Sequence, residues 1–453
     1  MNSLNLLSFP KKLLTGLLLV LSSLAAGNVN AQSALDLQAC IDYTLDHHAS
    51  TKIYLNQNVI AREQGKEMLA NYLPQVNGSI SIDDNIIRQT TIIPAGVFSP
   101  EDLEVQFGNQ YSSTAILQLD QVIYDQSLIT GLKANEPNME IAHLQGEQNE
   151  ESLIIQTAQA YYQVLATHQK LALLNENEQK FEEQLEVVKL QLEKGVAKQV
   201  DYDRIRVSLN NVRSQQVVLQ TNGQIALNRL RFVMGLPQDA ELELAEVELT
   251  DLDVSLPDLG LLDPGQNLNL QIQDQQLTLQ EIDLQRKQAS RIPTVSAYAR
   301  YGAQAMGDEF GPSLQNLFDF SSIGLKVNVP IFSGMRRQSQ IAQSRLNLEN
   351  AHLNYQLTQE NLNMQLQNAY TALASASASV EANRDNLALA KNVFDNSSLQ
   401  YQKGVAPFSD LINSDYAYKE AQNNYINSII NYLNARLDYE RANGSLNLYI
   451  QQL

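Results

Sequence analysis

The 453-residue sequence is poor in cysteine, tryptophan, glycine and proline. It contains one cysteine, no tryptophan, 20 glycines and 12 prolines. A single cysteine excludes a disulfide within one chain. Long stretches rich in Gln, Asn, Leu, Ala and Glu pass without a helix breaker. Such a composition favours long helices over several compact α/β domains.

Long apolar runs are also lacking, except at the N-terminus. A membrane helix needs about 20 consecutive apolar residues, so we expect no helix of the mature chain to span the inner membrane. Two lysines precede the apolar stretch 13–26, and small residues end at Ala31. This order predicts a signal peptide at 1–31, with the mature chain starting at Gln32. No lipid-acceptor cysteine follows, and we expect Cys40 to be a buried structural thiol.

The short motifs of catalytic sites are missing too. The mature chain has no CxxC, HExxH, GxSxG or phosphate-loop motif, and its histidines are dispersed except for His47 and His48. That pair could bind a metal, but a solvated helix face explains it better. The formal net charge of −19 argues against a nucleic-acid partner. We therefore expect no catalytic residue, no cofactor and no metal.

An internal repeat is the most informative feature that is present. QLEKGVAKQVD at 191–201 recurs as QYQKGVAPFSD at 400–410, and the same offset of 209 residues relates Gly235 to Gly444. A period of this size is far above that of solenoid repeats. It indicates a duplicated domain, for which we predict the boundaries 32–245 and 246–453.

Each copy contains a predicted strand hairpin. YLPQVNGSI (72–80) has a counterpart in RIPTVSAYA (291–299), displaced by 219 residues, so the first hairpin loop is about ten residues longer. Apolar and polar residues alternate after each proline, which is typical of strands with one apolar face. We predict hairpins at about 75–125 and 293–332, long enough for tilted barrel strands. A half-buried soluble sheet is the alternative.

Each copy also contains a predicted helical hairpin. Residues 127–193 and 335–402 contain only Pro137 as a strong breaker, and each would extend about 100 Å at 1.5 Å per residue. Helices of this length must pair with others. We predict hairpins at about 127–236 and 334–444, with tips at 194–201 and 403–410. Apolar residues at heptad-like spacing indicate antiparallel coiled-coil seams, namely Phe181, Leu185, Val188 and Leu192, then Ile205, Leu209, Val212 and Leu219, and in the second copy Leu411, Tyr418, Tyr425 and Tyr432.

Four membrane strands cannot close around a lumen, so a barrel would be shared between chains. Two chains would give eight strands and a filled interior, whereas three would give twelve strands and a channel. The odd positions of 323–329 would then face lipid. Lys326 and Asn328 would face the lumen.

These elements together resemble the TolC-like outer membrane efflux proteins. The resemblance is carried by the opening LDLQACIDYTLDHH (35–48), the strand entry YLPQV (72–76), the exit VPIFSG (329–334) and the two KGVA turns. It covers nearly the whole mature chain. It implies a mainly α protein with a membrane β-barrel portion: a homotrimer whose twelve-stranded barrel in the bacterial outer membrane continues as a periplasmic coiled-coil tunnel. A periplasmic adaptor and an inner-membrane transporter would be its partners.

The resemblance also implies roles for residues at the two helical tips. By motif position, Gly195, Val196, Gly404 and Val405 would contact the adaptor. Turn geometry alone is the alternative for the glycines, because a left-handed residue after a helix favours glycine.

In the family, acidic residues just beyond the second tip narrow the pore. Asp410 keeps the carboxylate at the matching position, whereas Asn413 does not. Asp201 and Tyr401 match residues that latch neighbouring helices, but Ala406 stands where the latch has an arginine. A network different from the familiar one is expected. For the two aspartates, an interaction with the helix dipole is the alternative.

Two rival functions remain from the sequence. A periplasmic coiled-coil scaffold or adaptor would explain the helices but not the repeated strands. Within the channel class, an efflux duct and a type I protein secretion duct share one architecture. The sequence does not choose between drugs, metal ions and polypeptides as cargo.

Overall fold

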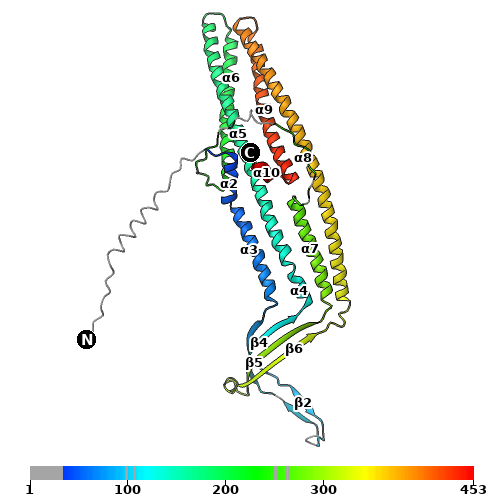
Figure 1. Ribbon diagram of the computed structural model, residues 1–453. Coiled ribbons are helices and arrows are strands. Elements are labelled where there is room, and N and C mark those ends of the chain that lie inside the picture. Colours follow the sequence, from blue (N-terminus) through cyan, green and yellow to red (C-terminus); the bar gives the residue numbers. More distant parts are fainter. Residues whose placement is uncertain are drawn as a thin grey trace, which may run out of the picture.

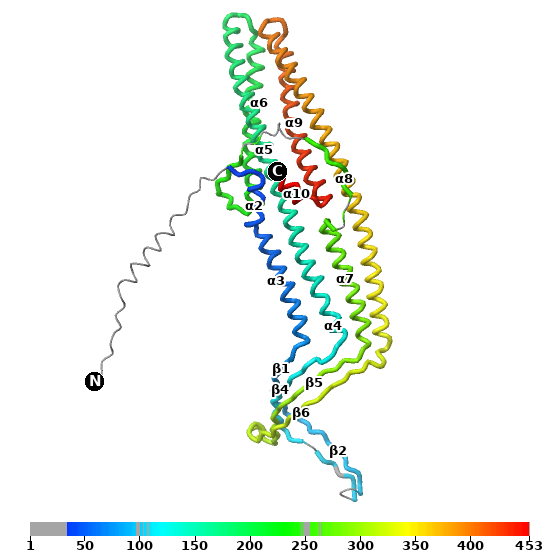
Figure 2. Tube along the Cα trace, in the orientation of Figure 1, coloured from blue at the N-terminus to red at the C-terminus, as the bar shows by residue number. Residues whose placement is uncertain are grey.

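A computed structural model describes residues 34–452, apart from 97–99, 107, 246, 248–253, 262 and 264. The predicted signal peptide lies outside the described residues. Long helices form one end of the molecule and antiparallel strands the other (Figures 1 and 2). Among the described residues, no helix is both long and apolar enough to cross a membrane.

The elements follow one another along the chain as two helix, strand and helix series. The first series is α2 (Leu37–His47), α3 (Ala49–Ala70), β1 (Gln75–Asp84), β2 (Thr90–Ile93), β3 (Leu103–Gln106), β4 (Tyr111–Tyr124), α4 (Gln126–Leu132), α5 (Asn135–Glu193) and α6 (Gln199–Met234). The second is α7 (Leu268–Ala289), β5 (Thr294–Gly307), η2 (Pro312–Leu314), β6 (Phe318–Asn328), α8 (Arg336–Gln402), α9 (Phe408–Asn443) and α10 (Leu446–Ile450).

The strands and helices form one continuous wall. The sheet order is β1-β4-β5-β6. Each of these strands is continued by a helix: β1 by α3, β4 by α4 and α5, β5 by α7, and β6 by α8. The helices keep that order, since α3 packs on α5, α5 on α7 and α7 on α8. Toward the tips the order becomes α6, α5, α9 and α8.

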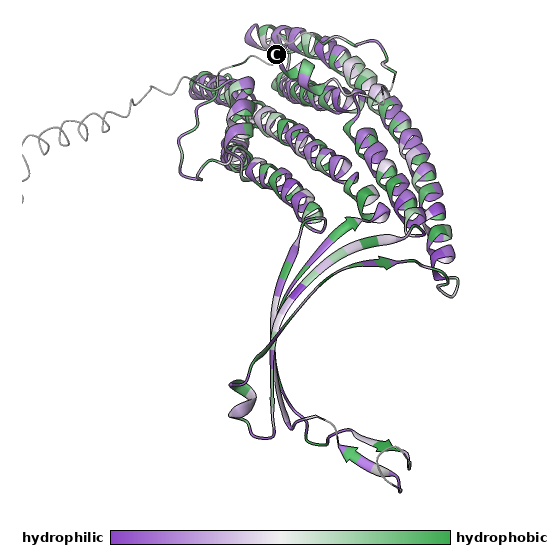
Figure 3. Cartoon of the chain, turned by 60° about the horizontal axis from the view of Figure 1, so that its bottom comes forward, coloured by the Kyte–Doolittle hydropathy of each residue, from purple (hydrophilic) through white to green (hydrophobic). Residues whose placement is uncertain are grey.

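All four strands turn their apolar residues to the same face of the sheet. Register pairs Val76 with Leu119, Leu119 with Ala299, and Ala299 with Ile323. Directly paired residues of antiparallel strands lie on one face. The alternation predicted from the sequence therefore belongs to a single curved sheet, whose strands Figure 3 shows with mixed hydropathy.

Two aromatic side chains cover glycines on the opposite face. Tyr298 pairs with Gly324, and Phe320 with Gly302. A Cβ at either glycine would come within 2.7 Å of the facing ring. Small residues at these positions therefore let bulky rings lie flat across neighbouring strands, a device that also stabilises strand pairing.

Two local features differ from the simple sequence picture. The helix predicted from residue 127 is interrupted between α4 and α5, shortly before Pro137, whose missing N–H removes one helical hydrogen bond to the preceding turn. The longer loop of the first strand hairpin holds a ladder of its own, in which β2 pairs with β3. Regular pairing in that loop has no counterpart between β5 and β6, which are joined through η2.

The main core lies midway along the helices, where α2 packs on α5. Cys40 is fully buried there, which confirms the predicted structural thiol. The connection before α7 is held against α9, because the Tyr432 hydroxyl donates to the carbonyl of Ser255 and the Tyr439 hydroxyl to that of Asp258.

Candidate functional site: the helical tips and the wall edges

Each helical hairpin turns through a left-handed glycine. Gly195 has φ of 72° and Gly404 of 71°. The amide of Val196 donates to the carbonyl of Gln191 at 2.9 Å, and that of Val405 to Gln400 at the same distance. This is a Schellman arrangement, which closes a helix end. The two tips therefore have the same backbone geometry.

The tips expose apolar side chains at the end of the molecule. Val196 is 77 % exposed and Val405 is 76 % exposed. Apart from the glycine and its two chain neighbours, no atom of the described residues lies within 4 Å of a Cβ built on Gly195 or Gly404. The four residues predicted as adaptor contacts thus form two small accessible surfaces, each with one apolar side chain.

The predicted gate residues lie around the starts of α6 and α9. Asp201 and Asp410 occupy the first turns of these helices. Asp410 and Asn413 are exposed, whereas Tyr401 is half-buried. Burial raises the pKa of Tyr401, and the negative charge of Asp201 raises it further. The fold therefore brings Tyr401 and Asp201 close together within one chain.

An apolar cluster joins the two hairpins behind the tips. Phe408, the first residue of α9, is 4 % exposed and stacks obliquely on Tyr401 with ring centroids 5.3 Å apart. Most of the predicted seam residues belong to this cluster, which contains Phe181, Val188, Ile205, Leu209, Val212, Phe394, Phe408 and Leu411, with Leu185, Tyr401 and Tyr418 at its margin. Of the other predicted seam residues, Tyr425 and Tyr432 lie in the main core, and Leu192 and Leu219 are in neither cluster.

Asp415 and Lys419 form a buried ion pair that the sequence reasoning missed. Their charged atoms are 2.6 Å apart, and their side chains are 12 % and 15 % exposed. The spacing of four residues on one helix was the available signal. It did not reveal burial, because burial depends on how α5 packs against α9.

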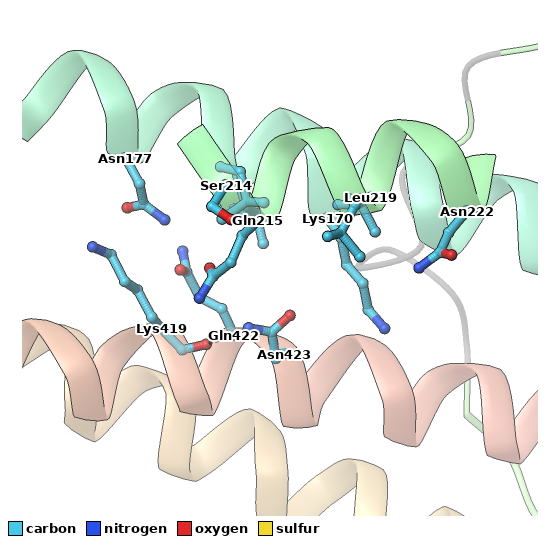
Figure 4. Close-up of a pocket in the computed structure, with 12 residues that line it drawn as sticks. Lys170, Asn177, Ser214, Gln215, Leu219, Asn222, Lys419, Gln422 and Asn423 are labelled. Atoms are coloured by element: carbon cyan, nitrogen blue, oxygen red, sulfur yellow. Dashed lines mark hydrogen bonds between the residues drawn. The ribbon is translucent and has the colours of Figure 1, made fainter. Parts of the chain in front are cut away.

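Cavities flank the contact between the hairpins. One, of about 270 Å³, lies between α5, α6 and α9, and Figure 4 shows Lys419 reaching across it toward Asn177. Another lies between α5, α8 and α9 near Tyr401. The hairpins thus meet chiefly along α5 and α9.

The two edges of the wall carry exposed apolar side chains. Within the part of the chain that the structure describes, β1 and β6 each have a sheet neighbour on one side only. Apolar residues more than 50 % exposed recur along the edge helices, namely Ile53 and Leu55 on α3, Val207, Val218, Ile225 and Phe232 on α6, and Leu346, Leu353, Leu357, Met364, Leu389 and Val393 on α8.

The predicted lumen residues lie on the polar face of the sheet. Lys326 pairs with Ser296, and Asn328 with Thr294. Arg300 is on the same face, where its guanidinium lies 5.3 Å from the ring centroid of Tyr298. The face thus combines cations, amides and two aromatic rings.

The histidine pair has a structural explanation. His47 stacks on Tyr43 with ring centroids 4.0 Å apart, and the ring of His48 accepts from the amide of Ser50 as the N-cap of α3. Over the described ranges, no group of three His, Cys, Asp or Glu side chains is arranged to hold a metal ion.

A small antiparallel sheet continued by long paired helices is the architecture of an outer-membrane channel subunit. The chain belongs to the outer membrane efflux protein family, whose sequence model matches residues 59–236 and 265–445. It is 23 % identical to the outer membrane protein TolC of Escherichia coli K12 over 349 residues, which are 75 % of this chain and 71 % of TolC.

A second relative and a solved structure are also similar to this chain. The alkaline protease secretion protein AprF of Pseudomonas aeruginosa is 22 % identical over 72 % of this chain and 68 % of its own. The crystal structure of the outer membrane protein VceC of Vibrio cholerae superposes with a TM-score of 0.71 at 15 % identity, covering 90 % of this chain and 96 % of VceC. That likeness extends to the whole fold.

Proposed function

We propose that three copies of this chain form an exit duct in the bacterial outer membrane, through which cargo passes from an inner-membrane transporter. The observation that carries this proposal is the open wall. Its sheet and its helices run in the same order from one end of the molecule to the other, and both edges are unpartnered in the described chain.

Closing the wall through copies of itself satisfies both edges at once. β1 of one copy would pair with β6 of the next, since unpaired strand edges cannot remain in hydrocarbon. The apolar stripes of α3 and α6 would meet α8 of the neighbour along the same line. Three copies give twelve strands, enough to leave an aqueous channel, whereas two give a filled barrel.

The two faces of the sheet support its orientation in a membrane. Ile80, Ile323 and Leu325 are 81 %, 86 % and 73 % exposed, although all are aliphatic. Lipid is the environment in which such a face is stable. The face with Arg300, Lys326 and Asn328 would then line the lumen.

The helical end would project into the periplasm and receive the other components of a tripartite system. We assign Val196 and Val405, each presented by a left-handed glycine turn, to contact with a periplasmic adaptor. Energy would come from the transporter in the inner membrane. Asp410, near the pore axis in a trimer, would influence ion passage.

Two kinds of cargo are compatible with this duct. Among the relatives of this chain, TolC is named an outer membrane protein and AprF an alkaline protease secretion protein. We assign the choice between small molecules and polypeptides to the inner-membrane transporter, because the wall residues named above contribute general polarity rather than a shaped ligand site.

Membrane fractionation tests the proposal. The full-length protein, expressed with its own N-terminus, should be recovered in the outer-membrane fraction and should migrate as a trimer in mild detergent, dissociating only on heating. A soluble monomer in the periplasmic fraction would contradict it and would favour a coiled-coil scaffold.

A further inference from the structure

The buried ion pair on α9 is seated on the other helical hairpin. The ammonium of Lys419 lies 3.9 Å from the centroid of the Phe181 ring on α5. Phe181 is 3 % exposed. A cation over an aromatic face interacts strongly when the contact is desolvated. Lys419 therefore connects Asp415, on its own helix, with the first hairpin.

The arrangement occurs in only one of the two hairpins. The residues 209 positions before Asp415 and Lys419 are Arg206 and Asn210, both exposed on α6. A general need of the coiled coil would apply to both copies. The charged pair is thus specific to the side of α9 that faces α5.

The pair lies where relative movement of the hairpins would be felt. It lies about two to three turns from the start of α9, and cavities lie on both sides of the α5 and α9 contact. The apolar cluster behind the tips also joins the hairpins at this level, and the pair adds the charged contact to it.

We infer that Asp415 and Lys419, seated on Phe181, form a charge-dependent link that holds α9 against α5 and limits the opening of the tunnel tip. The inference rests on the proposed channel function. The link needs both charges, since removing one partner leaves the other buried without compensation, whereas replacing both with apolar residues of similar volume restores packing.

Charges near the pair act in the expected directions. Burial raises the pKa of Asp415 and lowers the pKa of Lys419. The charge of Lys419 lowers the pKa of Asp415, and the charge of Asp415 raises the pKa of Lys419, so each acts against the effect of burial. Lys180 on α5 also faces the pair and lowers both pKa values. Each charge of the pair therefore stabilises the other against the effect of burial.

Four variants of the full-length protein test the link. Lys419→Met and Asp415→Asn each remove one charge, and the double variant Asp415→Leu/Lys419→Met removes both. Lys419→Arg keeps the charge and the contact with the ring. Arg213→Gln is the matched control, because Arg213 pairs with Glu178 and Glu182 inside the first hairpin at an exposed position.

Two measurements on detergent-purified protein are compared after trimer migration has been checked. Lys419→Met and Asp415→Asn should raise hydrogen exchange in residues 408–420 by about tenfold or more and increase single-channel conductance in a planar bilayer. The double variant, Lys419→Arg and Arg213→Gln should remain near the wild type. Wild-type exchange and conductance in both single-charge variants would overturn the link.

The test separates this inference from the proposed function. If the wild-type protein does not conduct, the channel itself is wrong. If the wild type conducts and the double variant is as open as the single-charge variants, charge is not the controlling property and the inference fails alone.

Discussion

Cys40 reports on the integrity of the helical core. Its side chain is fully buried, and burial raises the pKa of the thiol to about 12, with a further contribution from the charge of Asp36. The thiolate is the reactive form. A raised pKa therefore leaves almost no nucleophile at neutral pH.

Alkylation kinetics check this prediction. Native protein should resist iodoacetamide at neutral pH and gain reactivity only as the pH approaches about 12, while denatured protein should react near the ordinary thiol pKa of about 8.5. Rapid labelling of native protein at neutral pH would show that α2 is not docked as described.

In the proposed trimer, three Asp410 side chains would come together near the pore axis. Asp410→Asn should raise single-channel conductance or change its dependence on cations, because three carboxylates near the axis would be neutralised. Asp203→Asn is the control, since Asp203 is also exposed near a tip but lies on α6. An unchanged Asp410→Asn channel would favour the helix-dipole role.

Single residues differ in how well the sequence predicts them. Cys40, Gly195 and Gly404 were predictable, because a buried small slot and a left-handed turn are local properties. Asp415, Lys419 and Phe181 were not recognised together. Phe181 and Lys419 are more than 200 residues apart, and only the packing of α9 on α5 joins them.

The helical turns depend on a backbone conformation that side chains with a Cβ rarely adopt. Gly195→Val or Gly404→Val would cost about 1–2 kcal/mol at the left-handed position and would move the adjoining valine. Export should be lost while trimers still assemble. Asn tolerates this conformation, so Gly404→Asn should retain export.

Export assays with a trimer check on each variant provide the measurement. Normal export by both valine variants would refute the assignment of the tips to adaptor contact. Export by Gly404→Asn would show that the position needs the left-handed turn geometry and not glycine itself.

Phe408 packs in the cluster that joins the two hairpins, whereas Gln199, its counterpart in the first repeat, is exposed. Phe408→Ala removes a ring that is 4 % exposed and should lower stability by about 3 kcal/mol. The matched control is Gln199→Ala, at the exposed position 209 residues earlier. Thermal unfolding followed by helical circular dichroism should show a lower Tm for Phe408→Ala only, and equal Tm values would contradict the cluster.

The sequence predicts the helices and strands themselves better than it predicts which of them pack together. Period-two and heptad patterns are local, so the strands of the sheet and both helical hairpins were accessible from the sequence. The ladder of β2 and β3 was not, because its short strands lack a long alternation. The order in which α5, α7, α9 and α8 meet follows from tertiary packing, which no single segment encodes.

The whole molecule is a wall with two complementary edges. Val76, Ile80 and Ile82 on β1 and Ile323, Leu325 and Val327 on β6 belong to the same face of the sheet. Joining β1 to β6 of another copy keeps this face continuous. If β1 of one copy pairs with β6 of the next in antiparallel fashion, even-numbered residues of β1 lie opposite odd-numbered residues of β6. Cysteine pairs at such positions can therefore test the register of the interface.

Disulfide trapping between copies would show whether β1 of one chain pairs with β6 of the next. Ile80→Cys would be combined in turn with Ser321→Cys, Ile323→Cys or Leu325→Cys, positions near the middle of β6. Leu117→Cys/Tyr301→Cys is the matched control, because these residues pair within one sheet and should link only within a chain. The buried thiol of Cys40 should not interfere.

One of the three cysteine pairs should form most of the cross-linked product after mild oxidation in isolated outer membranes. We expect a ladder of covalent dimer and trimer that ends at the trimer, with the control remaining monomeric. Dimers alone, products larger than a trimer, or no cross-link in any of the three combinations would contradict a closed ring of three chains.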